Sequence, residues 1–135
     1  MSDKVFFDTN VLVYSIGQHD ARTPTADALL EQGGLISVQV LNELAAVAHR
    51  KLRMSWTEVT DALDAIRVLC PSPMPITAEM HDAALRLARQ YGFHIYDALI
   101  VAAALEANCT TLYSEDLQSG QVIDGRLTIH NPFSA

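Results

Sequence analysis

The most restrictive feature of the sequence is an uninterrupted apolar stretch over residues 98–105, inside an expected helix that covers residues 95–108. A helix that is apolar on every face has to be enclosed by protein, because a surface helix carries a polar stripe. The stretch is also shorter than the ~18 residues that a membrane-spanning helix needs. The chain is therefore expected to fold in layers around this helix, without contact to a membrane.

Strands and helices are expected to alternate along the chain. Val5-Phe6-Phe7 is a continuous apolar block, which is typical of a buried parallel strand. Further strands are expected at residues 35–38 and 110–114, and a final edge strand at 126–130. Helices are expected over residues 11–16, 23–32, 39–53, 55–69 and 77–91, and residues 70–76 should form an extended or loop segment. This alternation predicts a single α/β domain over residues 1–135: a three-layer sandwich with a central, mostly parallel sheet of four to five strands and helices on both faces.

Composition narrows the class of protein. Half of the 135 residues are hydrophobic and 19% are charged, as in a globular domain. Cys70 and Cys109 are far apart and form no metal-binding or redox motif, which favours a reduced, cytoplasmic protein. The net charge of −7 argues against a simple nucleic-acid coat protein. It leaves room for an enzyme that acts on nucleic acid, because bound cations reverse the charge of an acidic site.

Four acids fall where a parallel sheet places functional groups. Asp8 follows the first strand and Asp116 another strand, while Glu43 and Asp97 lie in the first turns of helices. These positions share one edge of the sheet, outside the carboxyl ends of the strands, where ligands bind in α/β folds. Asp8 could equally be a helix N-cap. Four clustered carboxylates need cations to remain ionised together, and such oxygen ligands suit Mg²⁺ or Mn²⁺ better than zinc.

Four short motifs carry a resemblance to a known family. They are Asp8-Thr9-Asn10, Asn42-Glu43, the Tyr-Asp-Ala-Leu-Ile segment at residues 96–100, and Ser114-Glu115-Asp116. Their order and spacing across nearly the whole chain resemble a PIN domain, and within that family the VapC-type ribonuclease toxins of toxin–antitoxin pairs. The resemblance implies a PIN-like fold and a metal-dependent endoribonuclease.

The resemblance also implies the roles of individual residues. The catalytic acids would be Asp8, Glu43, Asp97 and Asp116, with Asn10 and Ser114 supporting them through hydrogen bonds. Asp8 and Asp97 are expected to bind Mg²⁺ or Mn²⁺ directly, with Asp116 at or beside a second metal position. Glu43 is expected to orient a metal-bound water. The fourth acid is the most variable in the family, so Glu115 remains an alternative to Asp116.

The implied partners are an RNA substrate, a cognate antitoxin protein and a second copy of the chain in a homodimer. DNA would be contacted only indirectly, through the antitoxin. Two other functions stay open: a catalytically inactive PIN-fold interaction module, and a haloacid-dehalogenase-like phosphatase. The phosphatase would need a second Asp at position 10, where Asn10 stands.

The densest basic cluster is His49-Arg50-Lys51 together with Arg53. It could hold RNA phosphates or an acidic partner, but a solvated helix end explains it equally well, since cations are favoured at helix carboxyl termini. Nearby Trp56, with Met54, could be an exposed apolar anchor, but packing in the core is the stronger expectation.

Overall fold

The computed structural model describes residues 4–134. The strands are β1 (Val5–Phe7), β2 (Thr111–Tyr113), β3 (Val122–Ile123) and β4 (Leu127–His130). The helices are α1 (Thr9–Ile16), α2 (Thr23–Gln32), α3 (Val38–Arg50), α4 (Trp56–Leu69), α5 (Ala78–Tyr91) and α6 (Ile95–Glu106). Within residues 4–134, no helix combines the length and apolar character that crossing a membrane requires.

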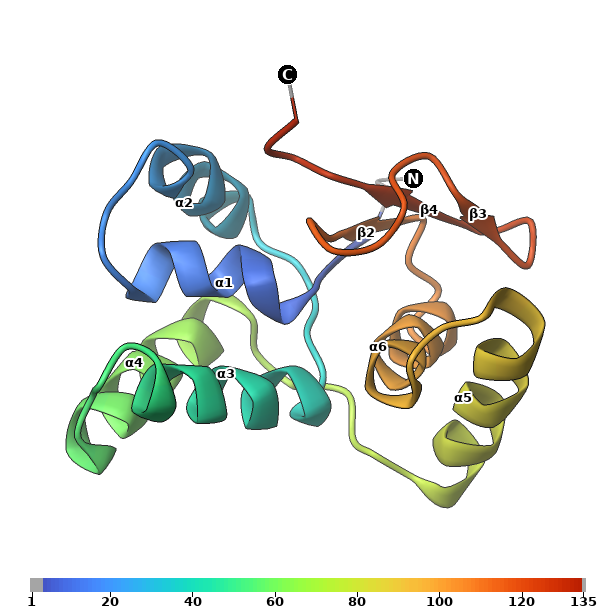
Figure 1. Cartoon of the computed structure of the whole chain (residues 1–135), viewed down its shortest axis with the longest axis horizontal. Coiled ribbons are helices and arrows are strands. Elements are labelled where there is room, and N and C mark those ends of the chain that lie inside the picture. The colour runs from blue at the N-terminus through green and yellow to red at the C-terminus, as the bar shows by residue number, and fades with distance from the viewer. Residues whose placement is uncertain (1–3, 135) are drawn as a thin grey trace.

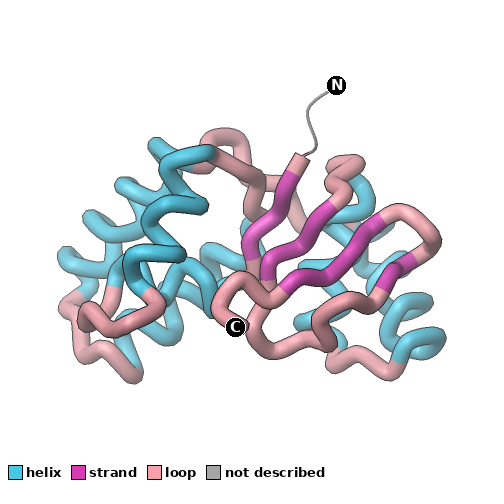
Figure 2. The backbone as a smooth tube through the Cα atoms, turned by 90° about the horizontal axis from the view of Figure 1, so that it is seen from above, coloured by secondary structure: helices cyan, strands magenta, loops and turns pink. Residues whose placement is uncertain are grey.

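The four strands form one sheet in the order β1-β2-β4-β3. β1 and β4 both run parallel to β2, and only β3 is antiparallel to its neighbour. Figure 1 shows α5 and α6 beneath the sheet, and Figure 2 shows α1–α4 gathered beyond its β1 edge. The predicted α/β fold with a mostly parallel central sheet is confirmed.

Helix α6 is the enclosed helix that the sequence predicted. All eight residues from Ala98 to Leu105 are buried. They belong to one core cluster with the inward-facing side chains of the sheet, among them Phe6, Leu112 and Ile129. The helix ends at Glu106, two residues earlier than expected, because Asn108 takes a left-handed conformation with φ of 60°.

Residues 35–38 do not form the expected strand. Leu35 makes an isolated bridge to Phe6, and Ser37 makes another to Met74. The Ser37 hydroxyl already caps α3, accepting a hydrogen bond from the Val40 amide at 3.2 Å. Because α3 begins at Val38 directly after this cap, the segment is too short to form a continuous strand and makes only isolated bridges.

The prediction that residues 126–130 form an edge strand was wrong, because β4 lies between β2 and β3. Its residues alternate between buried Leu127 and Ile129 and exposed Thr128 and His130. Alternation shows that one face of a strand meets solvent, and it carries no information about neighbours in the sheet. The edge strand on that side of the sheet is β3, which has only two residues and was not predicted.

The connection between α3 and α4 also differs from expectation. α3 ends at Arg50 rather than residue 53, and Arg53 adopts a positive φ of 57°. The predicted capping box of α4 is present, with Ser55 and Glu58 exchanging hydrogen bonds. Trp56 was expected in the core, but it is 62% exposed because it occupies the first, outward-facing turn of α4.

Candidate active site

The carboxyl ends of β1 and β2 place Asp8 beside Ser114. The parallel register pairs Phe7 with Tyr113, so the next residue of each strand lies at the same edge of the sheet. The Asp8 amide donates to the Tyr113 carbonyl at 2.9 Å, and the Ser114 hydroxyl donates to Asp8 Oδ2 at 2.8 Å. Both side chains are buried.

Asp8 combines the two roles that the sequence left open. It is the N-cap of α1, because its Oδ1 accepts a hydrogen bond from the Thr9 amide at 2.7 Å. The same side chain also lines an open cavity of about 420 Å³. Capping fixes the carboxylate in place, and its position at the cavity wall leaves it able to meet a ligand.

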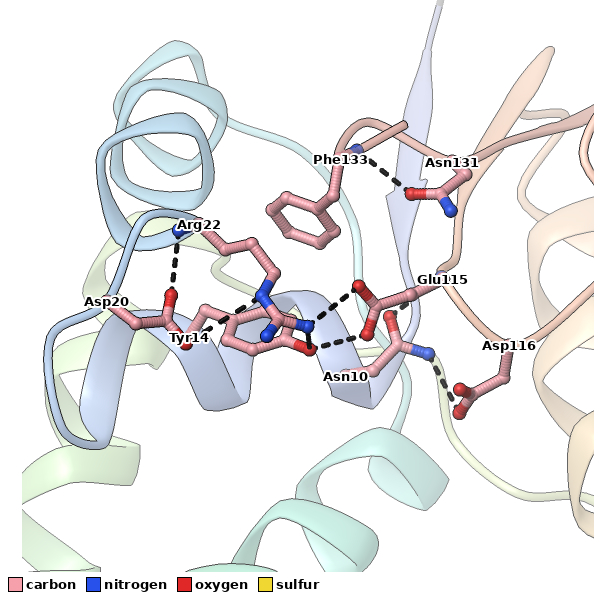
Figure 3. Close-up of polar contacts among 8 residues, drawn as sticks. All are labelled: Asn10, Tyr14, Asp20, Arg22, Glu115, Asp116, Asn131 and Phe133. Carbon is pink, nitrogen blue, oxygen red and sulfur yellow. Dashed lines mark hydrogen bonds and ion pairs between the residues drawn. The ribbon is translucent and has the colours of Figure 1, made fainter. Parts of the chain in front are cut away.

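Asn10 links three groups of the site. Its Nδ2 donates to Asp8 Oδ2 at 3.3 Å and to Asp116 Oδ2 at 3.2 Å. Its Oδ1 accepts from the Glu115 amide at 3.1 Å. Figure 3 shows the Asn10 side chain between Glu115 and Asp116. Asn10 therefore sets the position of the loop that follows β2 relative to α1.

Glu43 is held by two donors that the sequence analysis did not single out. The Thr9 hydroxyl donates to its Oε1 at 2.9 Å, and Gln39 Nε2 donates to its Oε2 at 3.0 Å. Gln39 precedes Glu43 by four residues on α3, which is the spacing of neighbouring side chains on one helix face. That spacing is a sequence signal that could have identified Gln39.

Glu115 is neutralised by its neighbours, unlike the four proposed acids. Arg22 forms a salt bridge to Glu115 at 3.2 Å, and the Tyr14 hydroxyl donates to the other carboxylate oxygen (Figure 3). The Arg22 guanidinium also lies over the Tyr14 ring, 4.5 Å from its centre. Desolvation and the contact with Glu115 raise the pKa of Tyr14 to about 12. This network was not predicted, because Glu115 lies 101 residues after Tyr14 and 93 residues after Arg22 in the chain.

All four predicted acids line the same cavity: Asp8, Glu43, Asp97 and Asp116. They come from the end of β1, from α3, from the first turn of α6, and from the loop after β2. None of the four forms a salt bridge with any residue in the described part of the chain. The cavity wall thus carries four carboxylates that have no salt-bridge partner within residues 4–134, and Lys51 also lines it.

Burial and mutual repulsion act on the protonation of this cluster. Desolvation, together with the nearby charges of Asp97 and Glu43, raises the pKa of Asp8 to about 7 against the opposing hydrogen bonds from Ser114 and the Thr9 amide. Desolvation followed by repulsion from Glu43 also raises the pKa of Asp97. Carboxylates that repel one another in this way bind cations or protons in preference to remaining free anions.

The donor set fits a hydrated divalent metal. Over residues 4–134, no three His, Cys, Asp or Glu side chains are arranged to enclose one ion. Mg²⁺ does not require such an enclosure, because it keeps several water ligands and is commonly bound through one or two carboxylates plus substrate phosphate. The carboxylate oxygens of this cavity are ligands of that type.

Comparison with known proteins assigns the chain to a family. The family model of the PIN domain matches residues 5–122, and the chain belongs to the PIN domain family. Membership of this family excludes the haloacid-dehalogenase-like alternative. No curated protein sequence matches the chain.

Several solved structures share the fold. A toxin–antitoxin complex from Klebsiella pneumoniae matches with a TM-score of 0.73 and 19% identity, covering 98% of this chain and 100% of that one. VapC20 of Mycobacterium tuberculosis, described as a sarcin–ricin-loop-cleaving toxin, matches with a TM-score of 0.68 and 22% identity over 84% and 90%. VapBC2 of Rickettsia felis, bound to a promoter DNA fragment, matches with a TM-score of 0.68 and 22% identity over 94% and 97%.

Proposed function

We propose that the protein is a metal-dependent endoribonuclease and the toxin of a type II toxin–antitoxin pair. The observation that carries this proposal is that Asp8, Glu43, Asp97 and Asp116 line one cavity and form no salt bridge with any residue from 4 to 134. Membership of the PIN domain family supports the same function, and so does the fold shared with the VapC20 toxin and with the toxin–antitoxin complex from Klebsiella pneumoniae.

The four acids would have different roles in phosphodiester hydrolysis. Asp8 and Asp97 would hold Mg²⁺ or Mn²⁺, and Asp116 would complete or flank a second position. Such an ion supplies Lewis acidity and lowers the pKa of a bound water. Glu43, fixed by Thr9 and Gln39, would accept a hydrogen bond from the attacking water and orient it.

Ser114 and Asn10 are positioning residues in this scheme. Both donate to Asp8 Oδ2, which leaves the direction of the Asp8 carboxylate fixed before substrate arrives. Protonated Asp8 must lose its proton to bind metal, so metal binding at neutral pH should release protons.

The partners proposed are an RNA substrate, a cognate antitoxin and a second copy of the chain, all in the cytoplasm. DNA would be reached only through the antitoxin. The structural neighbours that are toxin–antitoxin complexes support the antitoxin.

Metal-dependent cleavage tests the proposed function directly. Purified protein should cleave RNA internally with Mg²⁺ or Mn²⁺, lose this activity in a chelator, and regain it when metal is restored. Gel electrophoresis of an end-labelled RNA measures the products. Absence of cleavage under all metal conditions, in protein that is folded and binds Mg²⁺, would favour the alternative of an inactive interaction module.

A paired substitution distinguishes the two candidates for the fourth acid. Asp116→Asn should reduce kcat by about 10- to 100-fold, the usual cost of losing a group that supports a metal site. Glu115→Gln should have a smaller effect, because Arg22 and Tyr14 occupy the Glu115 carboxylate. Steady-state cleavage rates at saturating metal provide the comparison. A larger loss for Glu115→Gln than for Asp116→Asn would reverse the assignment.

A further inference from the structure

The connection between α3 and α4 presents a fixed aromatic surface. Trp56, the single tryptophan of the chain, is 62% exposed. Its ring stacks on that of His49, with centres 3.8 Å apart and planes inclined by 16°. His49 Nδ1 contacts the Met54 carbonyl at 3.0 Å, so this nitrogen carries the proton and the imidazole is held in place. The indole is therefore oriented before any ligand arrives.

Cations surround this aromatic surface in an otherwise acidic protein. The chain has 9 Lys and Arg residues against 16 Asp and Glu. Three of the nine, Arg50, Lys51 and Arg53, fall within four residues of the connection, and all three are exposed. None takes part in a salt bridge among residues 4–134. We refer to Lys51, Arg53, Trp56 and His49 together as the α3–α4 surface.

The acids beside the α3–α4 surface are already engaged. Asp20 and Glu58 line the same groove as Lys51 and Arg53. Asp20 accepts a hydrogen bond from the Arg22 amide at 2.7 Å, and Glu58 accepts one from the Ser55 amide at 2.9 Å. Lys51 and Arg53 form no salt bridge in the described part of the chain, so both remain available to an anionic ligand.

The groove is continuous with the acidic cavity. Lys51 lines both the cavity of about 420 Å³ that holds the four acids and the neighbouring groove of about 670 Å³. Val13 and Tyr14 of α1 also belong to both walls. A flexible chain that occupies the cavity can therefore continue along the groove, whose wall includes Met54 and Glu58, two residues before and after Trp56 in the chain.

We propose that the α3–α4 surface binds single-stranded RNA next to the scissile phosphate, and this inference rests on the proposed function. Trp56 stacks on a base, and Lys51 and Arg53 contact the adjacent phosphates. Exposed aromatic rings beside cations are the combination that binds single strands with little sequence preference. An acidic peptide would use the cations, but it gives no reason for an oriented, exposed indole. The surface also offsets the repulsion between RNA and a chain of net charge −7.

Binding and cleavage can be measured separately. An Asp97→Asn protein with Mg²⁺ should bind a fluorescein-labelled single-stranded RNA without degrading it, and fluorescence anisotropy gives the Kd. The emission of Trp56 should fall as RNA is added. The signal reports on Trp56 alone, because the chain has no other tryptophan. In the same background, Trp56→Ala should weaken binding roughly fivefold to a hundredfold, the range found for loss of one base–aromatic stack. Trp56→Phe should retain most of the affinity.

The cations have a separate signature and a matched control. Lys51→Ala/Arg53→Ala should reduce the slope of log Kd against log salt by about 1.4, since each contact with a single strand contributes about 0.7. Arg67→Ala/Arg89→Ala removes the same charge from exposed positions on α4 and α5 and should leave the slope unchanged. With catalytic Asp97 restored, the α3–α4 variants should raise KM without changing kcat.

Several outcomes would overturn the inference. They are unchanged RNA affinity in Trp56→Ala, equal losses in both double variants, or loss of antitoxin binding with RNA binding intact, which would assign the surface to a protein partner. If Trp56→Ala fails to fold, two measurements still test the inference: the fall in Trp56 emission in the Asp97→Asn protein, and the salt dependence of RNA binding in Lys51→Ala/Arg53→Ala. An Asp97-containing protein that never cleaves RNA contradicts the proposed function. If the Asp97-containing protein cleaves RNA but Trp56→Ala binds RNA with parental affinity, only the inference about the α3–α4 surface is contradicted.

Discussion

RNA cleavage should fall by about a hundredfold or more when Asp97 is replaced by asparagine. Substituting residues that merely support metal ligands commonly costs 10- to 100-fold, so loss of a direct ligand should exceed that range. Asp97 lies half-buried in the first turn of α6, on the wall of the acidic cavity. Asparagine keeps the shape of the side chain but removes the negative charge. Initial rates of cleavage over a series of Mg²⁺ concentrations would separate weaker metal binding from slower chemistry.

A second aspartate provides the matched control. Asp82 is an exposed residue of α5, and it lies outside the cavity. Asp82→Asn makes the same chemical change and alters net charge equally, so it should cleave RNA at the parental rate. Undiminished cleavage by Asp97→Asn, in a folded protein, would remove Asp97 from the proposed site. Equal losses in both variants would indicate a general effect of charge.

The parts of the fold that depend on local pattern could be predicted from the sequence. The enclosed helix α6 follows from eight consecutive apolar residues, and the start of α4 follows from the capping box of Ser55 and Glu58. The sheet was harder, because neighbours in a sheet are decided by contacts between distant segments. The two-residue strand β3 forms only against β4, and the β-branched pair of Val122 and Ile123 is too short a run to predict a strand.

The candidate site shows the same division. The positions of Asp8 and Ser114 follow from the rule for carboxyl ends of parallel strands, and the register that pairs Phe7 with Tyr113 places them side by side. The neutralisation of Glu115 was not predictable. It depends on Arg22, which lies 93 residues earlier in the chain and reaches Glu115 through the packing of α1 and α2.

Metal-free protein should become less stable as pH rises from about 4 to about 7, and Asp8 is the main cause. Its pKa is 3.8 when unperturbed and about 7 in the folded protein. Between these values the folded state binds more protons than the unfolded state, so the free energy of unfolding decreases with pH. The difference corresponds to roughly 4 kcal/mol. Above about pH 7 both states are ionised at Asp8 and the loss levels off.

Asp8→Asn should remove this dependence. Asparagine is as good an N-cap as aspartate, and its oxygen can still accept from the Thr9 amide. Its amide nitrogen cannot accept the hydrogen bonds that Oδ2 receives from Ser114 and Asn10, but the variant no longer places a desolvated charge at this position. The metal-free variant should therefore be more stable than the parent at pH 7.5 and similar to it at pH 4. Thermal unfolding followed by circular dichroism, over a pH series in the presence of chelator, measures the difference.

Metal should act on the parent in the opposite direction. An ion that binds only the folded state contributes ~2.7 kcal/mol when its concentration is a hundred times its Kd. Mg²⁺ or Mn²⁺ should therefore raise the Tm of the parent at pH 7.5. The increase should be much smaller at pH 4.5, where protons occupy the raised carboxylates of Asp8 and Asp97. Asp8→Asn should respond weakly to metal at both pH values.

The same measurements distinguish a ligand from a purely structural cap. Asp82→Asn should unfold like the parent at every pH and keep the full response to metal, because Asp82 is exposed on α5. If metal-free Asp8→Asn is no more stable than the parent at pH 7.5 and still gains the parental increase in Tm with metal, Asp8 acts only as the cap of α1. The repulsion among the cavity's carboxylates would then be too weak to govern stability, and the metal ligands would have to be sought among Glu43, Asp97 and Asp116.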